Sequence, residues 1–161
     1  MDEKPNNRSA TQVLDYRGMV FFRVPAWWLV AMEDDDQIVI FEDREASGTL
    51  RPWAEEYVFD DNTQRDATAH GLHEGQLTES LSEHVVLSYE VQDGEEEGEA
   101  LSHHRWTVTI RVGEKLLRVV TFTFTVEPKN EGTDDTNWEL QVVGLAVRSA
   151  LYPDSKSEAF S

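Results

Sequence analysis

The sequence predicts an α+β protein in which an antiparallel twisted sheet of about six strands packs between helices. Apolar residues occupy every second position from 106 to 112 and again from 120 to 126, which is the period of a strand with one buried face. The two-residue link Gly113-Glu114 has the length of a hairpin turn. Past residue 136 the apolar residues fall at helical spacing, so a helix is available to cover the apolar face of this hairpin.

The N-terminal stretch, residues 1–16, is polar and is expected to be a flexible tail in front of the domain. The first strand follows at residues 19–24 and ends at Pro25. Residues 27–30, Trp-Trp-Leu-Val, come next, and we expect this aromatic corner to pack under the edge of the sheet.

Two further strands are predicted in the first half of the chain. A short one covers residues 38–41, and a longer one covers residues 49–59. Because Pro52 has no N–H to donate to a ladder, the longer strand is expected to start late, to carry a bulge or to lie at an edge.

The stretch at residues 60–83 is predicted to be a helix, broken or kinked near Gly71 and Gly75. The helix prediction rests on four apolar residues in a polar background: Ala67, Leu72, Leu77 and Leu81. Residues 84–92 return to the alternation of a strand, and an acidic loop with a mobile tip is expected at residues 93–99.

The C-terminal helix is predicted over residues 137–152 and ends before Pro153. Thr136 and Glu139 lie three residues apart, the spacing of a capping box at a helix N-terminus. One apolar stripe follows at helical spacing, formed by Leu140, Val143, Val147 and Leu151.

The length of 161 residues favours one domain, placed at residues 17–153, with a flexible C-terminal tail at residues 154–161. The chain has no cysteine, which excludes disulfides, thiolate metal sites and cysteine nucleophiles, and which fits a reducing compartment. The sequence shows neither the pattern of a signal peptide nor the run of ~20 apolar residues that spans a membrane. We therefore expect a cytoplasmic protein.

The formal net charge of −18 argues against nucleic acid or an anionic membrane as a partner, since both attract basic surfaces. A basic protein partner would suit such a surface. A solvated acidic surface without a partner, or adaptation to salt, would account for the same charge.

Four stretches of the chain resemble the PsbP superfamily, which contains the extrinsic photosystem II protein and the Mog-type Ran-binding import factor. Residues 21–28, Phe-Phe-Arg-Val-Pro-Ala-Trp-Trp, are similar to the opening strand, proline and tryptophan of that family. Residues 48–51 are similar to the start of its third strand, residues 106–126 to its central hairpin and residues 137–152 to its closing helix. The resemblance implies an α/β/α sandwich and a bacterial member of unknown function. No family motif for photosystem or Ran binding can be transferred to this chain.

The histidines offer a weak metal site. His70 and His73 are three residues apart, a spacing that presents two ligands on one face of a helix, but no third ligand is assured. His103 and His104 are adjacent in a predicted strand and therefore point to opposite faces. We expect no metal and no other cofactor.

Catalytic motifs are missing from the sequence. It contains no Gly-x-Ser-x-Gly elbow, no phosphate-binding loop and no dinucleotide fingerprint. We therefore expect a protein that is not an enzyme.

The polar face of the central hairpin is the main candidate binding surface. If no helix covers it, it is a flat mixed surface that suits a protein partner; the alternative is that the helix predicted at residues 60–83 covers it. We expect Trp53 to be a core residue, with an exposed anchor of the binding surface as the alternative. The candidate residues of the face are Arg105, Thr107, Thr109, Arg111, Thr121, Thr123 and Thr125.

These observations favour a non-catalytic module that binds another protein, such as an adaptor, a secretion-linked chaperone or an immunity protein. A domain that binds a small molecule or a metal, with a pocket beside Trp53 or beside His70 and His73, is the alternative. A hydrolase, which requires a Ser or Asp beside a His in one cleft, is less favoured.

Overall fold

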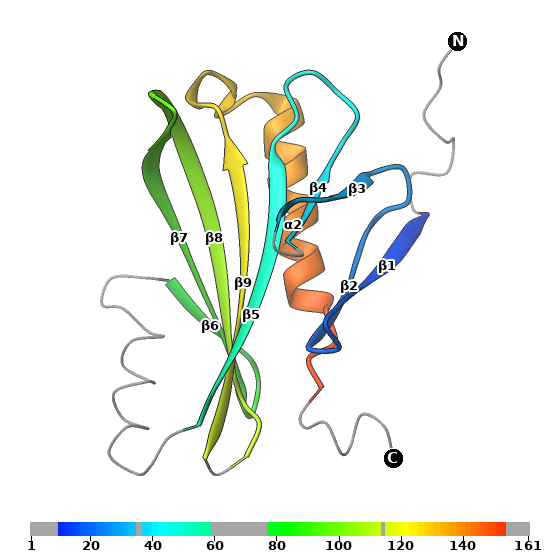
Figure 1. Ribbon diagram of the computed structural model, residues 1–161, viewed down its shortest axis with the longest axis vertical. Coiled ribbons are helices and arrows are strands. Elements are labelled where there is room, and N and C mark those ends of the chain that lie inside the picture. The colour runs from blue at the N-terminus through cyan, green and yellow to red at the C-terminus, as the bar shows by residue number, and fades with distance from the viewer. Residues whose placement is uncertain (1–9, 35–36, 59–76, 114, 154–161) are drawn as a thin grey trace.

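The computed structural model describes residues 10–34, 37–58, 77–113 and 115–153, with the backbone alone for Leu77. Within these residues the chain forms nine strands, one 3₁₀ helix and one α-helix (Figure 1). The elements are β1 (Thr11–Tyr16), β2 (Val20–Pro25), β3 (Leu29–Met32), β4 (Ile38–Phe41), β5 (Thr49–Val58), β6 (Leu77–Ser82), β7 (Val85–Glu96), β8 (Glu99–Arg111), β9 (Leu116–Val126), η2 (Pro128–Asn130) and α2 (Asp134–Ser149).

Seven strands form one antiparallel sheet in the order β3-β4-β5-β9-β8-β7-β6, and β1 pairs with β2 as a separate hairpin. The predicted α+β class and antiparallel sheet are confirmed. The sheet is larger than predicted, and the described residues hold a single α-helix. The described residues therefore do not form the predicted sheet between two helical layers.

The hydrophobic core lies on one face of the sheet, under α2 and the β1–β2 hairpin. The predicted central hairpin is confirmed: β8 pairs with β9, and Trp106 lies opposite Phe122. Their inward side chains alternate with outward ones, as the period of a strand requires. Phe22 of β2 meets the Phe122 ring edge-on with ring centroids 5.2 Å apart, and Val143 of α2 belongs to the same buried cluster.

Residues 11–16 form strand β1, so the prediction of a tail is wrong for them; residues 1–9 lie outside the described part. Leu14 and Tyr16 alternate toward the core, and Tyr16 is buried. The turn to β2 is tight because Arg17 and Gly18 both have positive φ. The side chain of Asp15 accepts a hydrogen bond from the backbone N–H of Gly18 at 2.7 Å.

The helix predicted at residues 60–83 is wrong for its last part, because residues 77–82 form β6 and pair with β7. Leu77 and Leu81 are four residues apart, and that spacing puts two side chains on one face of a strand as well as of a helix. Residues 59–76, with Gly71 and Gly75, lie outside the described part.

The acidic loop predicted at residues 93–99 is also a strand pair. β7 continues to Glu96 and β8 begins at Glu99, which lie opposite each other. The turn consists of Glu97 and Gly98, both at positive φ, the geometry that matches the twist of the flanking strands. The acidic residues therefore do not prevent β7 from pairing with β8, because Glu97 and Gly98 form the turn between them.

The C-terminal helix is confirmed, but it begins earlier than predicted. Thr133 is the N-cap, and its hydroxyl accepts a hydrogen bond from the backbone N–H of Thr136. Thr136 and Glu139 are buried inside the helix and do not form a capping box. The helix ends at Ser149, so Leu151 leaves the predicted stripe and forms a bridge with Phe21 of β2.

The corner predicted at residues 27–30 is only partly buried, and it packs against α2 instead of under the sheet edge; Trp28 is buried, whereas Leu29 and Val30 are exposed. The Trp27 ring stacks on Trp138 of α2 and the Trp28 ring meets Trp138 edge-on, each with centroids 6.1 Å apart. β5 begins at Thr49 and pairs with β9 without a register shift, so a late start or a bulge at Pro52 is wrong. The edge alternative holds only locally, because β4 pairs with β5 at Thr49 and Leu50 and not at Pro52. Residues 29–32, which were not predicted to be a strand, form β3.

Replacing Phe122 by Ala should lower the free energy of unfolding by about 3–5 kcal/mol, because it leaves a cavity against Phe22 and α2. Urea unfolding followed by circular dichroism measures this loss. Thr121→Ala, one residue along β9 on the opposite face, is the control and should cost far less. A loss for Phe122→Ala no larger than that of Thr121→Ala would contradict this core.

Candidate functional site

The face of the sheet opposite α2 carries most of the predicted binding residues. Arg105 of β8 lies opposite Thr123 of β9, and Thr107 lies opposite Thr121. Trp53 of β5 flanks Thr121 on the other side. The structure thus gathers these five residues on one face.

The other predicted residues of this face lie toward its far end. Thr109 lies opposite Val119, and Arg111 is exposed at the end of β8. Whether the stretch at residues 60–83 covers the face stays a prediction, because residues 59–76 lie outside the described part. His70 and His73 lie there too.

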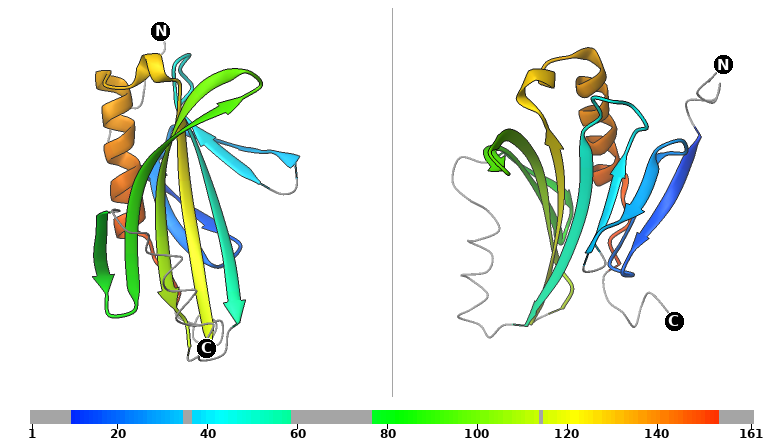
Figure 2. Two further views of the ribbon diagram at one scale, coloured as in Figure 1. Left: turned by 90° about the vertical axis from the view of Figure 1, so that its left-hand side faces the viewer. Right: turned by 45° about the horizontal axis from the view of Figure 1, so that its top comes forward.

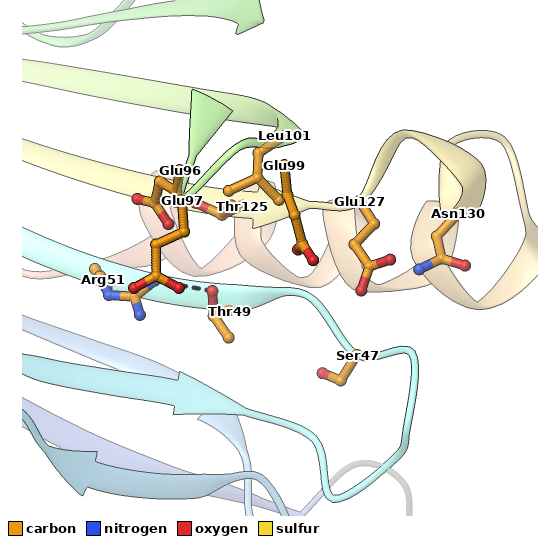
Figure 3. Close-up of a pocket in the computed structure, with 10 residues that line it drawn as sticks. All are labelled: Ser47, Thr49, Arg51, Glu96, Glu97, Glu99, Leu101, Thr125, Glu127 and Asn130. Carbon is orange, nitrogen blue, oxygen red and sulfur yellow. Dashed lines mark hydrogen bonds between the residues drawn. The ribbon is translucent and has the colours of Figure 1, made fainter. Parts of the chain in front are cut away.

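A groove of about 570 Å³ lies on this face (Figure 3), and we call it the acidic groove. Figure 2 shows the β7–β8 hairpin bending over this end of the sheet. Figure 3 shows carboxylates from the turn and from the end of β9 pointing toward β5. Its lining residues are Ser47, Thr49, Arg51, Glu96, Glu97, Glu99, Leu101, Thr125, Glu127 and Asn130.

The charge of the acidic groove is strongly negative. Its one basic lining residue, Arg51, is already paired: its Nε and Nη2 donate to the two carboxylate oxygens of Glu33 at 2.8 and 2.9 Å, and its Nη1 donates to Thr49 at 2.9 Å. These hydrogen bonds from Arg51 lower the pKa of Glu33, while Glu33 and the charge of Glu96 raise the pKa of Arg51. The glutamates of the β7–β8 turn form no ion pair with another described residue.

A second hollow of about 640 Å³ continues the groove along the sheet, toward Trp53. His103 lines it, and its Nδ1 lies 3.0 Å from the Thr125 hydroxyl. Arg105 lines it as well and donates to the Gln92 side chain at 2.9 Å. Trp53 is 39% exposed, so it lies on the polar face and not in the core. The walls of both hollows are mainly polar.

A hydrogen-bonded trio on the opposite, core-facing side was not predicted. The Nε2 of His104 lies 2.9 and 3.1 Å from the carboxylate oxygens of Glu131, and its Nδ1 lies 2.6 Å from the Tyr89 hydroxyl. His104 is only 5% exposed. The sequence did signal part of this, because alternation places His104 on the face of Trp106.

The trio is better suited to structure than to catalysis. Burial, aided by the charge of Glu131, raises the pKa of Tyr89, so a nucleophilic tyrosinate is disfavoured there. Its hydrogen bonds instead join β7, β8 and the segment that leads into α2. In the described residues no group of three or more His, Asp or Glu side chains is placed to hold a metal ion.

Comparisons with known proteins define the fold and leave the family open. No protein-family model matches the chain, and no curated protein matches it. A crystal structure of a Bacteroides thetaiotaomicron protein is similar, with a TM-score of 0.55 and 13% sequence identity. The match covers 86% of this chain and 46% of that one, so this chain spans less than half the length of that protein. At this identity the likeness shows the fold alone, and the PsbP resemblance stays a prediction.

One further finding concerns membranes. Among the described residues, no helix has the length and apolar character needed to cross a bilayer.

Replacing Arg51 by Gln should raise the pKa of Glu33 toward its ordinary value, because the hydrogen bonds from Arg51 are the main cause of its lowering. Because the pKa of this carboxyl is lower in the folded protein, the ion pair stabilises the fold at pH values above the carboxyl pKa of the unfolded chain. This stabilisation is lost as the pH falls through the carboxyl pKa of the folded protein. A nuclear magnetic resonance titration of the Glu33 carboxyl carbon measures the shift. Arg105→Gln is the control; an equal Glu33 pKa in both variants would contradict the pairing.

Proposed function

We propose that this chain is a non-catalytic binding module whose acidic groove takes a basic segment of another protein. One observation carries the proposal: Glu96, Glu97 and Glu99 face a groove in which Arg51, the only basic residue among the described lining residues, is already paired with Glu33. The net charge of −18 acts in the same direction, since it raises the local concentration of a basic partner. An adaptor, a secretion-linked chaperone or an immunity protein would each use such a surface.

Electrostatic attraction predicts how such binding should behave. Exposed charges steer the encounter, so they act mainly on the association rate and are screened by salt. Lysine or arginine side chains in the groove would approach several carboxylates at once, while the threonines of the sheet supply hydroxyls for polar contacts. Two paired strands supply lining residues, Thr49 and Arg51 from β5 and Thr125 from β9, and such pre-formed positions would need little rearrangement to bind.

A small-molecule site is the second candidate function, and the exposure of Trp53 is the observation that favours it. The hollow beside Trp53 also contains His103 and Arg105. Pockets for small molecules are mostly apolar, with a few polar groups, whereas this hollow is mostly polar. We therefore favour a polypeptide ligand.

Changing Glu96, Glu97 and Glu99 together to Gln should weaken the binding of a fluorescent octa-lysine peptide by about tenfold at low salt, because three carboxylates are lost from the groove. Fluorescence anisotropy measures the affinity. For the unchanged protein, about 0.5 M salt, which limits charge interactions to a few ångströms, should abolish most of the binding.

The control changes the net charge equally at exposed positions that do not line the groove: Asp43→Asn, Glu45→Gln and Glu83→Gln. If both triple variants lose the same affinity, the charge of the whole protein attracts the peptide and the groove is not a site. Binding that does not respond to salt would also overturn the proposal.

A further inference from the structure

The strand β3 forms one edge of the seven-stranded sheet and is apolar and exposed throughout. It pairs with β4 on one side, and no described strand pairs with its other side. Its four residues are Leu, Val, Ala and Met, all exposed, and Met32 is 64% exposed. Figure 2 shows the β3–β4 hairpin projecting from the body of the protein, away from α2. An exposed apolar edge is a template for another strand.

Hydrogen bonding identifies the backbone groups that face outward. The N–H of Glu33 donates to the carbonyl of Gln37 across the β3–β4 turn. In an antiparallel pair, residues bonded to the partner strand alternate with residues whose N–H and C=O point away from it. Val30 and Met32 therefore point theirs outward. Trp28 fits this pattern, because its carbonyl accepts a hydrogen bond at 2.8 Å from the Gln12 side chain.

The other edge of the sheet is formed by β6, and it differs in each respect. Its sequence is mostly polar, Leu-Thr-Glu-Ser-Leu-Ser, and its pairing with β7 shifts register between Ser80 and Ser82. Glu79 in its centre pairs with Arg148 of α2. Charge and irregular pairing are the features that protect edge strands from other chains. In β3 the described register is regular and no residue is charged.

We propose that the outer edge of β3 pairs with an extended segment of a basic partner protein, which adds an eighth strand to the sheet. The basic character of the partner rests on the proposed function; the pairing rests on β3 itself. The outward N–H and C=O groups of Val30 and Met32 supply the hydrogen bonds, and the exposed apolar side chains of β3 supply contact area.

Charge favours such a segment over a second copy of this chain. Each copy carries a net charge of −18, and the exposed Asp34 lies in the turn after β3, next to Glu33, which is already paired with Arg51. A segment antiparallel to β3 places its N-terminal end beside this acidic turn, so basic residues should come before its strand-forming part. Glu33 and Gln37 also line the hollow that continues the acidic groove. A basic segment leaving β3 at this end therefore lies next to that hollow.

The test uses a fluorescent peptide of four lysines followed by Val-Thr-Val-Thr-Val. A matched peptide carries N-methyl groups on the backbone amides of the five strand residues, which keeps every charge and side chain but blocks strand pairing. We expect N-methylation to weaken binding at least about tenfold, because the added strand loses its backbone hydrogen bonds. Binding of the first peptide should also slow hydrogen exchange at the amides of Val30 and Met32.

Two variants test the protein side. Val30→Pro removes an outward N–H that β4 does not use and should weaken binding about as much as N-methylation does. Val30→Thr keeps the backbone donor and the branched side chain, so its affinity should stay within about twofold of the unchanged protein. Since the peptide comparison and hydrogen exchange use the unchanged protein, the test does not depend on the folding of Val30→Pro.

The outcomes separate this inference from the proposed function. Equal affinity for both peptides, together with octa-lysine binding that requires the groove glutamates, would overturn the β3 inference and leave the groove intact. Loss on N-methylation without any role for the groove glutamates would support β3 and overturn the groove. If the unchanged protein sediments as a dimer and Val30→Pro as a monomer, the occupant is a second copy and the inference is wrong.

Discussion

The alternation of side chains along β8 and β9 is the constraint on which the rest of the structure depends. Every second residue of these strands, such as Trp106 and Phe122, is buried under α2. The residues between them, such as Thr107 and Thr121, point to the opposite side and form the polar face. A shift of one residue in the pairing would exchange the two faces. The same register therefore fixes both the hydrophobic core and the position of the acidic groove.

One buried acidic residue, Glu139, connects α2 to the sheet. Glu139 of α2 is wholly buried, accepts from Arg44 at 2.6 Å and from the backbone N–H of Gly48 at 3.3 Å, and so joins the helix to the loop before β5. Burial raises the pKa of Glu139, against the pull of Arg44. Gly48 is needed there because any Cβ would collide with the Phe124 ring. Since β5 begins one residue later, this contact also positions Thr49 in the groove.

The sequence was a good guide where one short pattern decides the structure, and a poor one where distant segments meet. Alternation predicted the β8–β9 hairpin, and helical spacing predicted α2. The strand β6 was missed because a spacing of four residues fits both periods. The groove was missed because Arg51, Glu97 and Glu127 come from three separate strands or turns, and only the strand order brings them together. Arg118 likewise donates to two groups that are distant from it in sequence, the carboxylate of Glu56 and the carbonyl of Pro153.

The distribution of charge explains why the surface, rather than the interior, is where function should be sought. The chain has 14 basic and 32 acidic residues. Several of the arginines are already paired within the protein: buried Arg118, partly buried Arg44 and the more exposed Arg51 and Arg148 each contact a carboxylate. The excess of acidic groups therefore falls on surfaces such as the β7–β8 turn. The glutamates of the β7–β8 turn, Glu96, Glu97 and Glu99, repel one another and so destabilise the isolated chain slightly. Under the proposed function, a basic partner would relieve that repulsion on binding.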